Sequence, residues 1–484
     1  MALLALTIAV TIGGGIADNE RSSTTEQLWE EHAPIYINGN EDFKTTAQNE
    51  GWFGNGSSTN PYLIEGLNIT TPSTSISIEN TNMYFHITNC LVESYYVPYT
   101  SFSGGIYFAN VSNAIISNNT VYYVEGIRLR KCTNISFISN KARVMLSVEI
   151  LSSKNIQIIN NTIKGLAFGI EIPSSKNIQI INNNISQINA DAIVLQSTEN
   201  SVISGNRINT TSQGIGISIQ GGQYNSIRHN NIRNCNGSGI FIHTYEGIHI
   251  IENTISNNNG TGIDLRDSVK TNLIGNNVSY NAWDGLFLYN TREITLSTNN
   301  ITNNGRTGLL LEDSEKVKIS DNNVTHNHDT GITLLNCRET NITTNNISNN
   351  AINGIILWNS TNNNVSTNVI ALNHDYGVYL TRQAISNIIE WNDFIQNNQN
   401  GTSQAYDEGE HNIFDYNYWD DWTAPDTNYD GIVDRPYPIA GPENNTDLHP
   451  RTSVPYIRWN VLFGLMFLVG IMVVLGLILI KQKI

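Results

Sequence analysis

A run of acidic and amide residues late in the chain has the composition of a calcium loop. Residues 426–431 read DTNYDG, and Asp434 follows three positions later. Calcium loops of this kind bind the ion with carboxylate and amide oxygens and place a glycine at their sharp turn. An EF-hand would add a glutamate at the twelfth position, where this chain has Tyr437. Two interpretations stay open, a weak structural calcium site or a metal-free cluster of turns, and both use Asp426, Asn428, Asp430 and Asp434.

Other ionisable residues recur at the spacing of a repeat that is described below. Glu149 and Glu171 stand at the same offset of neighbouring units, and Asp264 has that offset further along. If the units stack, the two glutamates lie about 5 Å apart, where they could bind calcium or act as an acid and base pair. Histidine and aspartate precede two units that are two repeats apart, roughly 10 Å. That is too far to share one metal ion, so we expect solvated turn residues at His326, His328, Asp329, His374 and Asp375.

The composition argues against several functions. The chain has 26 Lys and Arg against 42 Asp and Glu, a formal net charge of −16. We therefore expect no nucleic-acid partner, because its phosphates would be repelled. The four cysteines show no CxxC spacing and are expected to be buried free thiols. Clustered sulfur or imidazole ligands, which Cu(I) prefers, are not seen. We expect no cofactor other than the structural calcium considered above.

An internal repeat organises most of the chain. A glycine that is followed by an alternating apolar pair recurs in steps of 23 residues at Gly239, Gly262, Gly285, Gly308, Gly331, Gly354 and Gly377. The series extends backwards to residue 105 in steps of 21 to 24. An asparagine stands fourteen positions after each of these starts except Gly377, where it slips by one position to Asn392. Apolar pairs of period two between turn residues indicate short strands. Each unit is therefore predicted to contain two or three strands and no helix.

Stacking these units predicts an all-β fold, a right-handed, single-stranded parallel β-helix of about 14 coils, with 21–24 residues in each coil. Equal offsets then lie one strand spacing apart, so that inward Ile, Val and Leu form columns that serve as the core. The recurring asparagines are predicted to tolerate left-handed backbone at a turn and to form a ladder of amide hydrogen bonds between coils. The ladder residues are Asn206, Asn230, Asn253, Asn276, Asn299, Asn322, Asn345 and Asn368.

The ends of the chain predict its location. Residues 1–18 resemble a signal peptide. The predicted transmembrane helix at 460–480 contains an unbroken apolar run long enough to cross a bilayer. Lysines in the tail 481–484 place it in the cytoplasm by the positive-inside rule. We thus expect a single-pass protein of the cell membrane with its N-terminal ectodomain outside, and Asn-x-Ser/Thr triplets that permit glycosylation. Residues 71–399 hold the coils, and aromatic-rich segments at 28–70 and 400–453 are expected to cap them.

Three blocks of the sequence resemble the NosD family of β-helix proteins. They are Ile35–Ile69 (IYINGNEDF…GWFGNGSSTNPYLIEGLNI), the coils with their pattern G-I-x-L-x-x-S-x-x-N-x-I-x-x-N-x-I, and Asn417–Pro450 (NYWDDWTAPDTNYDGIVDRPYPIAGPENNTDLHP). The resemblance covers residues 35–450 and implies a right-handed β-helix. It also implies kinship with archaeal surface proteins, with carbohydrate-binding proteins and sugar hydrolases, and with a periplasmic protein of copper-enzyme maturation. The predicted membrane anchor departs from that soluble protein and puts a copper role in doubt.

We therefore expect a non-catalytic, membrane-anchored surface protein that binds a polysaccharide or a surface protein along its lateral face. Exposed aromatic residues in the insertion Tyr95–Phe102, together with Trp283 and Trp358, are candidates for stacking on sugar rings. One alternative is a polysaccharide lyase, epimerase or hydrolase that acts on a uronate-rich chain. Another, which the resemblance implies, is an accessory protein for metalloenzyme maturation that works with an ABC transporter.

Overall fold

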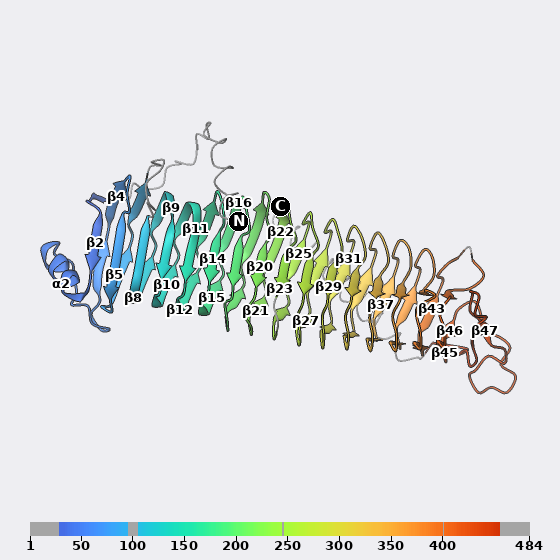
Figure 1. Ribbon diagram of the computed structural model, residues 1–484. Coiled ribbons are helices and arrows are strands. Elements are labelled where there is room, and N and C mark those ends of the chain that lie inside the picture. The colour runs from blue at the N-terminus through green and yellow to red at the C-terminus, as the bar shows by residue number, and fades with distance from the viewer. Residues whose placement is uncertain (1–28, 95–104, 244–245, 400, 455–484) are drawn as a thin grey trace, which may run out of the picture.

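The computed structural model describes residues 29–94, 105–243, 246–399 and 401–454. There the chain winds into an all-β, right-handed parallel β-solenoid of about 15 turns (Figure 1). Among these residues the only helix is α2 (Asn40–Asn49), at the N-terminal end of the rod. The predicted fold class is confirmed for this part of the chain, with about one turn more than expected.

Each regular coil contains three short strands, and each strand pairs in parallel with the strand three places later. The first strands form one stack: β2 (Ile35–Asn38), β5 (Ile76–Thr81), β14 (Ile170–Pro173), β17 (Ile193–Gln196), β20 (Ile217–Gln220), β23 (Ile240–His243), β26 (Ile263–Arg266), β29 (Leu286–Tyr289), β32 (Leu309–Glu312), β35 (Ile332–Leu335), β38 (Ile355–Trp358), β41 (Val378–Leu380) and β44 (Ala405–Asp407). Three longer strands turn a corner and each contribute to two stacks: β8 (Ile106–Ser117), β9 (Thr120–Arg130) and β11 (Lys141–Leu151).

The second and third strands of the coils form the other two stacks. The second stack contains β3 (Tyr62–Glu65), β6 (Phe85–Thr88), β10 (Thr133–Ile138), β12 (Lys154–Ile159), β15 (Lys176–Ile181), β18 (Val202–Ser204), β21 (Ser226–Arg228), β24 (His249–Ile251), β27 (Asn272–Ile274), β30 (Thr295–Ser297), β33 (Lys318–Ser320), β36 (Asn341–Thr343), β39 (Asn364–Ser366), β42 (Ile388–Glu390), β45 (Ile413–Asp415) and β48 (Thr446–Asp447). The third contains β1 (Glu30–Glu31), β4 (Leu67–Thr71), β7 (Leu91–Ser94), β13 (Thr162–Gly165), β16 (Asn184–Ile188), β19 (Arg207–Thr211), β22 (Asn231–Cys235), β25 (Thr254–Ser256), β28 (Asn277–Ser279), β31 (Asn300–Thr302), β34 (Asn323–Thr325), β37 (Asn346–Ser348), β40 (Val369–Ala371), β43 (Asp393–Ile395) and β46 (Tyr418–Trp419). The short strand β47 (Tyr437–Pro438) pairs antiparallel with β48.

The alternation of side chains along each strand separates the core from the surface. In β26, Ile263 and Leu265 are completely buried and lie opposite Leu286 and Leu288 of the next coil. Because side chains alternate across a strand, the residues between and after them face outward. Glycine begins the coil because two coils approach closely there. A Cβ atom at Gly262 would lie 2.5 Å from the carbonyl oxygen of the next coil's glycine.

The asparagines at offset fourteen lie in one buried column. Each of the eight predicted ladder residues donates a side-chain N–H to the amide oxygen of the asparagine one coil on, at 2.9 or 3.0 Å. Their backbone N–H groups donate to the same oxygens, as Asn276 does to Asn299. The left-handed residue of the turn is the one before each asparagine, such as Thr298 with φ of 54°. The column is therefore held by hydrogen bonds, and the expectation of left-handed asparagines there is wrong.

The ladder ends at a carboxylate. Every amide in the column donates toward the C-terminal end, so its last member leaves donors that need an acceptor. Asn417 donates its backbone and side-chain N–H groups to Oδ2 of Asp447, at 2.9 and 3.1 Å. A second buried column begins at Asn258 and ends at Gln404, whose side-chain nitrogen donates to Asp420 and Asp421. Negative charge thus closes the donor end of both columns.

Aromatic side chains fill the core at both ends. At the N-terminal end, α2 buries Phe43, whose ring centroid lies 5.1 Å from those of Tyr62 and Phe85. At the other end, Trp419 stacks between Phe394 and Tyr437 with centroid distances of 4.2 and 4.0 Å. The segments 28–70 and 400–453, where caps were expected, also supply strands to the three stacks.

No helix among the described residues is long and apolar enough to cross a membrane. The segments 1–18, 460–480 and 481–484, for which a signal peptide, a transmembrane helix and a cytoplasmic tail were expected, lie outside the described residues, as does the insertion Tyr95–Phe102.

Candidate functional site

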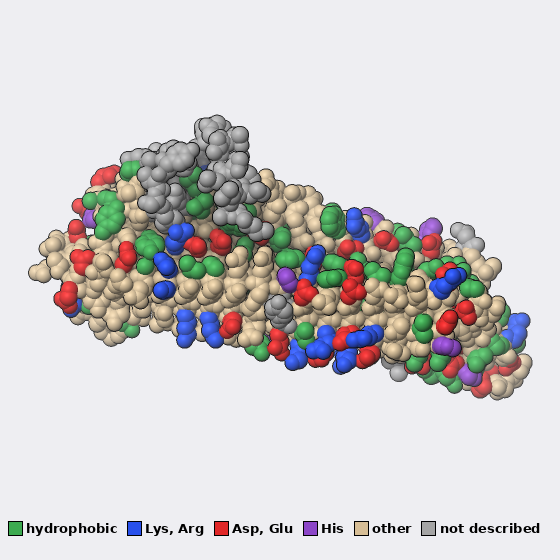
Figure 2. Space-filling model, in the orientation of Figure 1, with side chains coloured by type: hydrophobic (Ala, Val, Ile, Leu, Met, Phe, Trp, Pro, Cys, Tyr) green, Lys and Arg blue, Asp and Glu red, His purple; other side chains and the backbone are tan. Residues whose placement is uncertain are grey.

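The outward side of the first-strand stack between β23 and β44 carries a band of aromatic and apolar side chains, which we call the aromatic face. Successive coils place two outward columns in register along it. The first column is Phe241, Asp264, Phe287, Leu310, Thr333, Ile356, Tyr379 and Tyr406. The second column is His243, Arg266, Tyr289, Glu312, Leu335 and Trp358. Figure 2 shows hydrophobic side chains interspersed with charged ones along this part of the rod.

One arginine is held flat on the aromatic face. The guanidinium of Arg266 lies 5.7 Å from the ring centroid of Phe241 and 5.5 Å from that of Phe287. Its Nε and Nη2 atoms donate to both carboxylate oxygens of Asp264, at 2.8 and 2.9 Å. Aromatic rings on both sides and a bidentate carboxylate restrict the guanidinium to one orientation. The pair places fixed polar groups between two aromatic rings of the face.

Aromatic rings cluster at the C-terminal end of the face. Tyr379 lies 5.3 Å from Tyr406 and 6.0 Å from Tyr376, measured between ring centroids. Burial raises the pKa of both Tyr376 and Tyr379, so their phenols stay protonated and can donate hydrogen bonds at neutral pH. Trp358 is 54% exposed on the same face, and Trp283, under Arg306 at 4.9 Å, is 52% exposed. An exposed tryptophan offers a large rigid apolar surface to a ligand.

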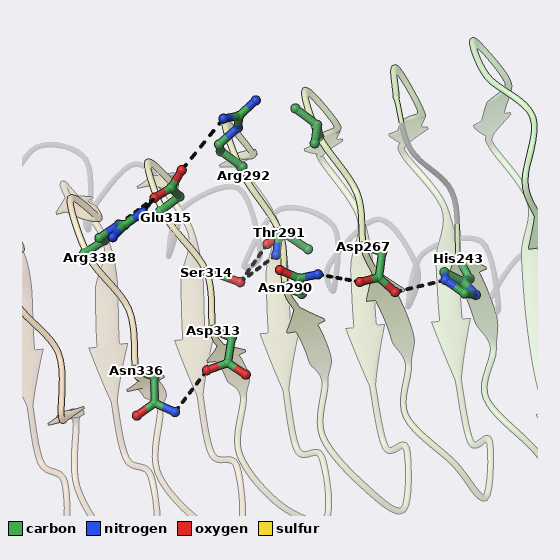
Figure 3. Close-up of a pocket in the computed structure, with 11 residues that line it drawn as sticks. His243, Asp267, Asn290, Thr291, Arg292, Asp313, Ser314, Glu315, Asn336 and Arg338 are labelled. Atoms are coloured by element: carbon green, nitrogen blue, oxygen red, sulfur yellow. Dashed lines mark hydrogen bonds and ion pairs between the residues drawn. The ribbon is translucent and has the colours of Figure 1, made fainter.

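A groove of about 760 Å³ follows the corner between the first and second strands, next to the aromatic face (Figure 3). We call it the C-terminal corner groove. Asn290 donates to Asp267 at 2.6 Å, and His243 lies 2.9 Å from the same carboxylate. On the other wall, Glu315 pairs with Arg338, and this hydrogen bond lowers the pKa of Glu315. The charges of this groove are therefore largely satisfied by one another.

The carboxylates that the sequence singled out lie on the first-strand stack. Glu149 and Glu171 are direct neighbours in the parallel pairing of β11 with β14, and Arg128 of the preceding coil pairs with Glu149. Burial raises the pKa of Glu171, and the charge of Glu149 adds to the effect. Asp264 belongs instead to the arginine clamp described above. The structure thus brings two of these three carboxylates together.

The histidine and aspartate residues lie in turns, as expected. His326, His328 and His374 are exposed, and His374 contacts the carboxylate of its neighbour Asp375 at 2.8 Å. Asp329 accepts a hydrogen bond from the backbone N–H of Thr330 at 2.7 Å. Groups of three or more His, Cys, Asp or Glu that could hold a metal ion are not found among the residues that the structure describes.

The carboxylates of the loop at 426–434 are engaged with the loop's own backbone and side chains. Asp430 accepts a hydrogen bond from the backbone N–H of Ile432 at 2.9 Å. Asp426 accepts one from the backbone N–H of Gly431 at 3.2 Å, and Asp434 accepts one from the backbone N–H of Thr427 at 2.8 Å. The side chain of Asn428 donates to Asp430. These contacts form a turn cluster, and calcium binding at the loop stays a prediction.

The fold and its lateral faces define a right-handed parallel β-helix protein. Residues 145–278 match the family described as right handed beta helix region, and residues 267–439 match the periplasmic copper-binding protein family, NosD. These two adjoining matches support a NosD-like parallel β-helix.

Several solved structures are similar to the chain at low identity. The chain is 15% identical to the Dettilon tailspike protein, with a TM-score of 0.43 and 60% of either chain covered. It is 15% identical to a double mutant of the periplasmic alginate epimerase AlgG, with a TM-score of 0.39, 75% of this chain and 84% of that one covered. The chain is 10% identical to a mannuronan C-5 epimerase A-module of Azotobacter vinelandii, with a TM-score of 0.33, and the match covers 75% of this chain and 85% of that one. No curated protein matches the chain.

The described residues do not fit the copper that the family description names. The four cysteines lie on separate coils, are buried, and donate to backbone carbonyls, as Cys337 does to Leu311. Burial raises the pKa of the Cys337 thiol to about 12 and that of the other three to about 11. Copper is bound by thiolates, clustered thioethers or converging imidazoles. The described residues contain protonated thiols, only two methionines (Met83 and Met145), and no group of three His, Cys, Asp or Glu that could hold a metal ion.

Sequence reasoning identified Trp283 and Trp358 but missed most of the aromatic face. Its other rings, at Phe241, Phe287, Tyr289, Tyr379 and Tyr406, stand two or four residues after the start of their coils. These are outward positions of a strand, so aromatic residues there have no role in the core. Aligning the coils and inspecting only the outward offsets would have revealed the band.

Proposed function

We propose that this protein is a surface glycan-binding protein that holds a linear polysaccharide along its aromatic face. The observation that carries the proposal is the band of outward aromatic and aliphatic side chains from Phe241 to Tyr406, in which five of eight successive coils carry an aromatic ring. The C–H faces of sugar rings are apolar and pack on such side chains, while sugar hydroxyls need polar partners beside them. Arg266, Asp264 and the tyrosine phenols offer such partners on the same strip.

The shape of the face supports a linear ligand. Neighbouring strands in a stack are about 4.8 Å apart, and one sugar unit lengthens a polysaccharide by a comparable distance. The coils therefore present equivalent positions at the repeat of the ligand. A ligand that contacts several coils gains a small part of its binding free energy from each coil. The face therefore suits a long polysaccharide better than a single sugar.

We also propose that the rod is displayed outside the cell membrane. The apolar residues 461–480 are long enough to span a bilayer, and the lysines beyond them favour a cytoplasmic tail. Partners of a surface-displayed rod would be polysaccharides or surface proteins. Protease digestion of intact cells tests this orientation: the rod should be accessible and the last four residues protected, and the reverse pattern would contradict it.

A glycan array tests the binding function. The full-length protein in detergent should bind at least one linear glycan, and the double variant Trp358→Ala/Tyr379→Ala should lose at least about tenfold in affinity for it. The control is Tyr280→Ala, which removes a 60% exposed tyrosine from a turn outside the aromatic face. Binding of no glycan, or equal losses in the control and in the double variant, would overturn the proposal.

A second candidate function is cleavage or epimerisation of a uronate-rich chain at Glu149 and Glu171. It rests on the in-register carboxylates, on the raised pKa of Glu171, and on the cation of Arg128 beside them. A carboxyl group with a raised pKa can serve as an acid or base near neutral pH. New unsaturated or reducing ends, formed by the wild type and lost in Glu171→Gln, would support this function, and intact polymer after prolonged incubation would exclude it.

A further inference from the structure

Basic residues are concentrated in one short part of the chain. Residues 128–176 contain eight Lys and Arg but only two acidic residues, Glu149 and Glu171, a net charge of +6. The whole chain carries −16, so the remainder carries −22. Figure 2 shows Lys and Arg side chains along most of the rod; on the left part few red side chains lie beside them, whereas further right they are mixed with Asp and Glu. A cationic zone on an otherwise acidic rod creates a local field that attracts anions.

Part of this zone forms a groove, which we call the N-terminal corner groove. It has a volume of about 500 Å³ and follows the same corner as the C-terminal corner groove, several coils earlier. Lys154 and Lys176 are direct neighbours in the pairing of β12 with β15, and Lys131 lies on the preceding coil. Serine hydroxyls line it as well, at exposed left-handed turn positions that stack from coil to coil: Ser152, Ser174 and Ser197.

The cations of this groove differ from those of the later groove in their pairing. Lys131 and Lys154 are exposed, and no carboxylate lies within ion-pair distance of either among the residues that the structure describes. Lys176 contacts Glu199 at 3.3 Å. In the C-terminal corner groove, by contrast, Glu315 already pairs with Arg292 and Arg338. Two unpaired ammonium groups on neighbouring coils are available to an external anion.

We propose that the N-terminal corner groove binds an acidic stretch of a polysaccharide, through sugar carboxylate or sulfate groups. This inference rests on the proposed function and deepens it, because it names the chemical class of the glycan. Lys154 and Lys176 lie about one strand spacing apart, and Lys131 stands on the preceding coil two residues before Thr133, the register neighbour of Lys154. One sugar unit spans a length comparable to the strand spacing, so successive acidic sugars can meet ammonium groups of successive coils. The serine hydroxyls beside the lysines form hydrogen bonds with the sugar hydroxyls.

The surroundings of the groove favour an acidic glycan over a nucleic acid. Its described lining residues include no aromatic side chain on which a base could stack. Glu199 follows Lys176 at the same position of the next coil, and Glu246 stands at that position two coils further on. These two carboxylates would repel a long polyanion, whereas a glycan with a short block of acidic sugars would not reach them.

Calorimetric titration of the full-length protein in detergent tests the proposal. The probes are an oligogalacturonate, a sulfated dextran fragment and a single-stranded oligonucleotide. We expect one or both acidic glycans to bind, and the double variant Lys131→Gln/Lys154→Gln to weaken that binding by at least about tenfold. The control, Lys316→Gln/Lys318→Gln, removes two exposed lysines from a later coil and changes the net charge equally. It should bind as the wild type does.

The outcomes separate this proposal from the proposed function. If the wild type binds array glycans but neither acidic probe, or if both double variants lose affinity equally, the groove is not an acidic-glycan site and the glycan-binding function stands. If the wild type binds no glycan at all, both the acidic-glycan site and the glycan-binding function are wrong. Binding of the oligonucleotide as tight as that of the acidic glycans would show general attraction of polyanions and overturn the assignment. Unchanged circular dichroism melting curves establish that the variants are folded.

Discussion

Replacement of Asp284 by asparagine should stabilise the protein at neutral pH. Asp284 is buried where one coil begins, and it accepts the backbone N–H of Thr307 of the next coil at 3.1 Å. Burial raises its pKa from 3.8 to about 6. Three coils later the same position is Asn353, which accepts the backbone N–H of Tyr376 at 3.0 Å. An amide oxygen therefore makes the same contact without a buried charge.

The raised pKa gives both the sign and the size of the effect. The folded state takes up a proton near pH 6, and the unfolded chain does so only near pH 4. Lowering the pH through this window therefore stabilises the wild type, and the ionised carboxylate destabilises it at higher pH. A difference of about two pKa units corresponds to about 2–3 kcal/mol at pH 8. This is the gain in free energy of unfolding that Asp284→Asn should approach at pH 8, shrinking to zero below pH 4.

Urea unfolding followed by circular dichroism at pH 8 and pH 4 measures this difference. The reciprocal variant Asn353→Asp should be destabilised at pH 8 and close to the wild type at pH 4, which controls for the position. Equal stability of Asp284→Asn and the wild type at pH 8 would refute the reasoning. So would an equal loss of stability in Asn353→Asp at pH 8 and at pH 4. In that case the carboxylate would have favourable partners that outweigh its burial.

Three further predictions concern the C-terminal end of the rod and the cysteines. Asp447→Ala should lower the free energy of unfolding by about 3–5 kcal/mol, because buried donors of Asn417 and Trp419 lose their acceptor. Asp447→Asn should lower it far less, because an amide oxygen can still accept. Equal midpoints of urea unfolding for the two variants would contradict this. Calcium should raise the melting temperature, and a chelator or Asp430→Ala should abolish the rise; a melting curve indifferent to calcium would exclude the site. The four buried thiols should resist iodoacetamide at pH 8 in the folded protein and react in urea, and fast labelling of the native protein, seen by mass spectrometry, would contradict their burial.

The offset of the asparagines illustrates how far the repeat alone could lead. A constant spacing of 23 residues places Asn253, Asn276 and Asn299 above one another, and the amide geometry then permits one hydrogen bond per coil. The direction of the column and its closure at Asp447 could not be predicted in this way. Asp447 follows Asn417 by 30 residues, after a segment that has no repeat.

The architecture of the rod follows from the amino-acid repeat alone. Units that carry apolar residues at fixed offsets bury them only by stacking, so the period dictates the coil, the core columns and the outward positions. Which outward side chains contact one another is visible only in the folded rod. Arg266 could have extended into solvent, yet it lies between Phe241 and Phe287 on Asp264. Among the described residues Lys154 has no carboxylate at ion-pair distance, whereas Arg338 pairs with Glu315. Such choices depend on side-chain rotamers and on neighbours one coil away, which a periodic pattern leaves undetermined.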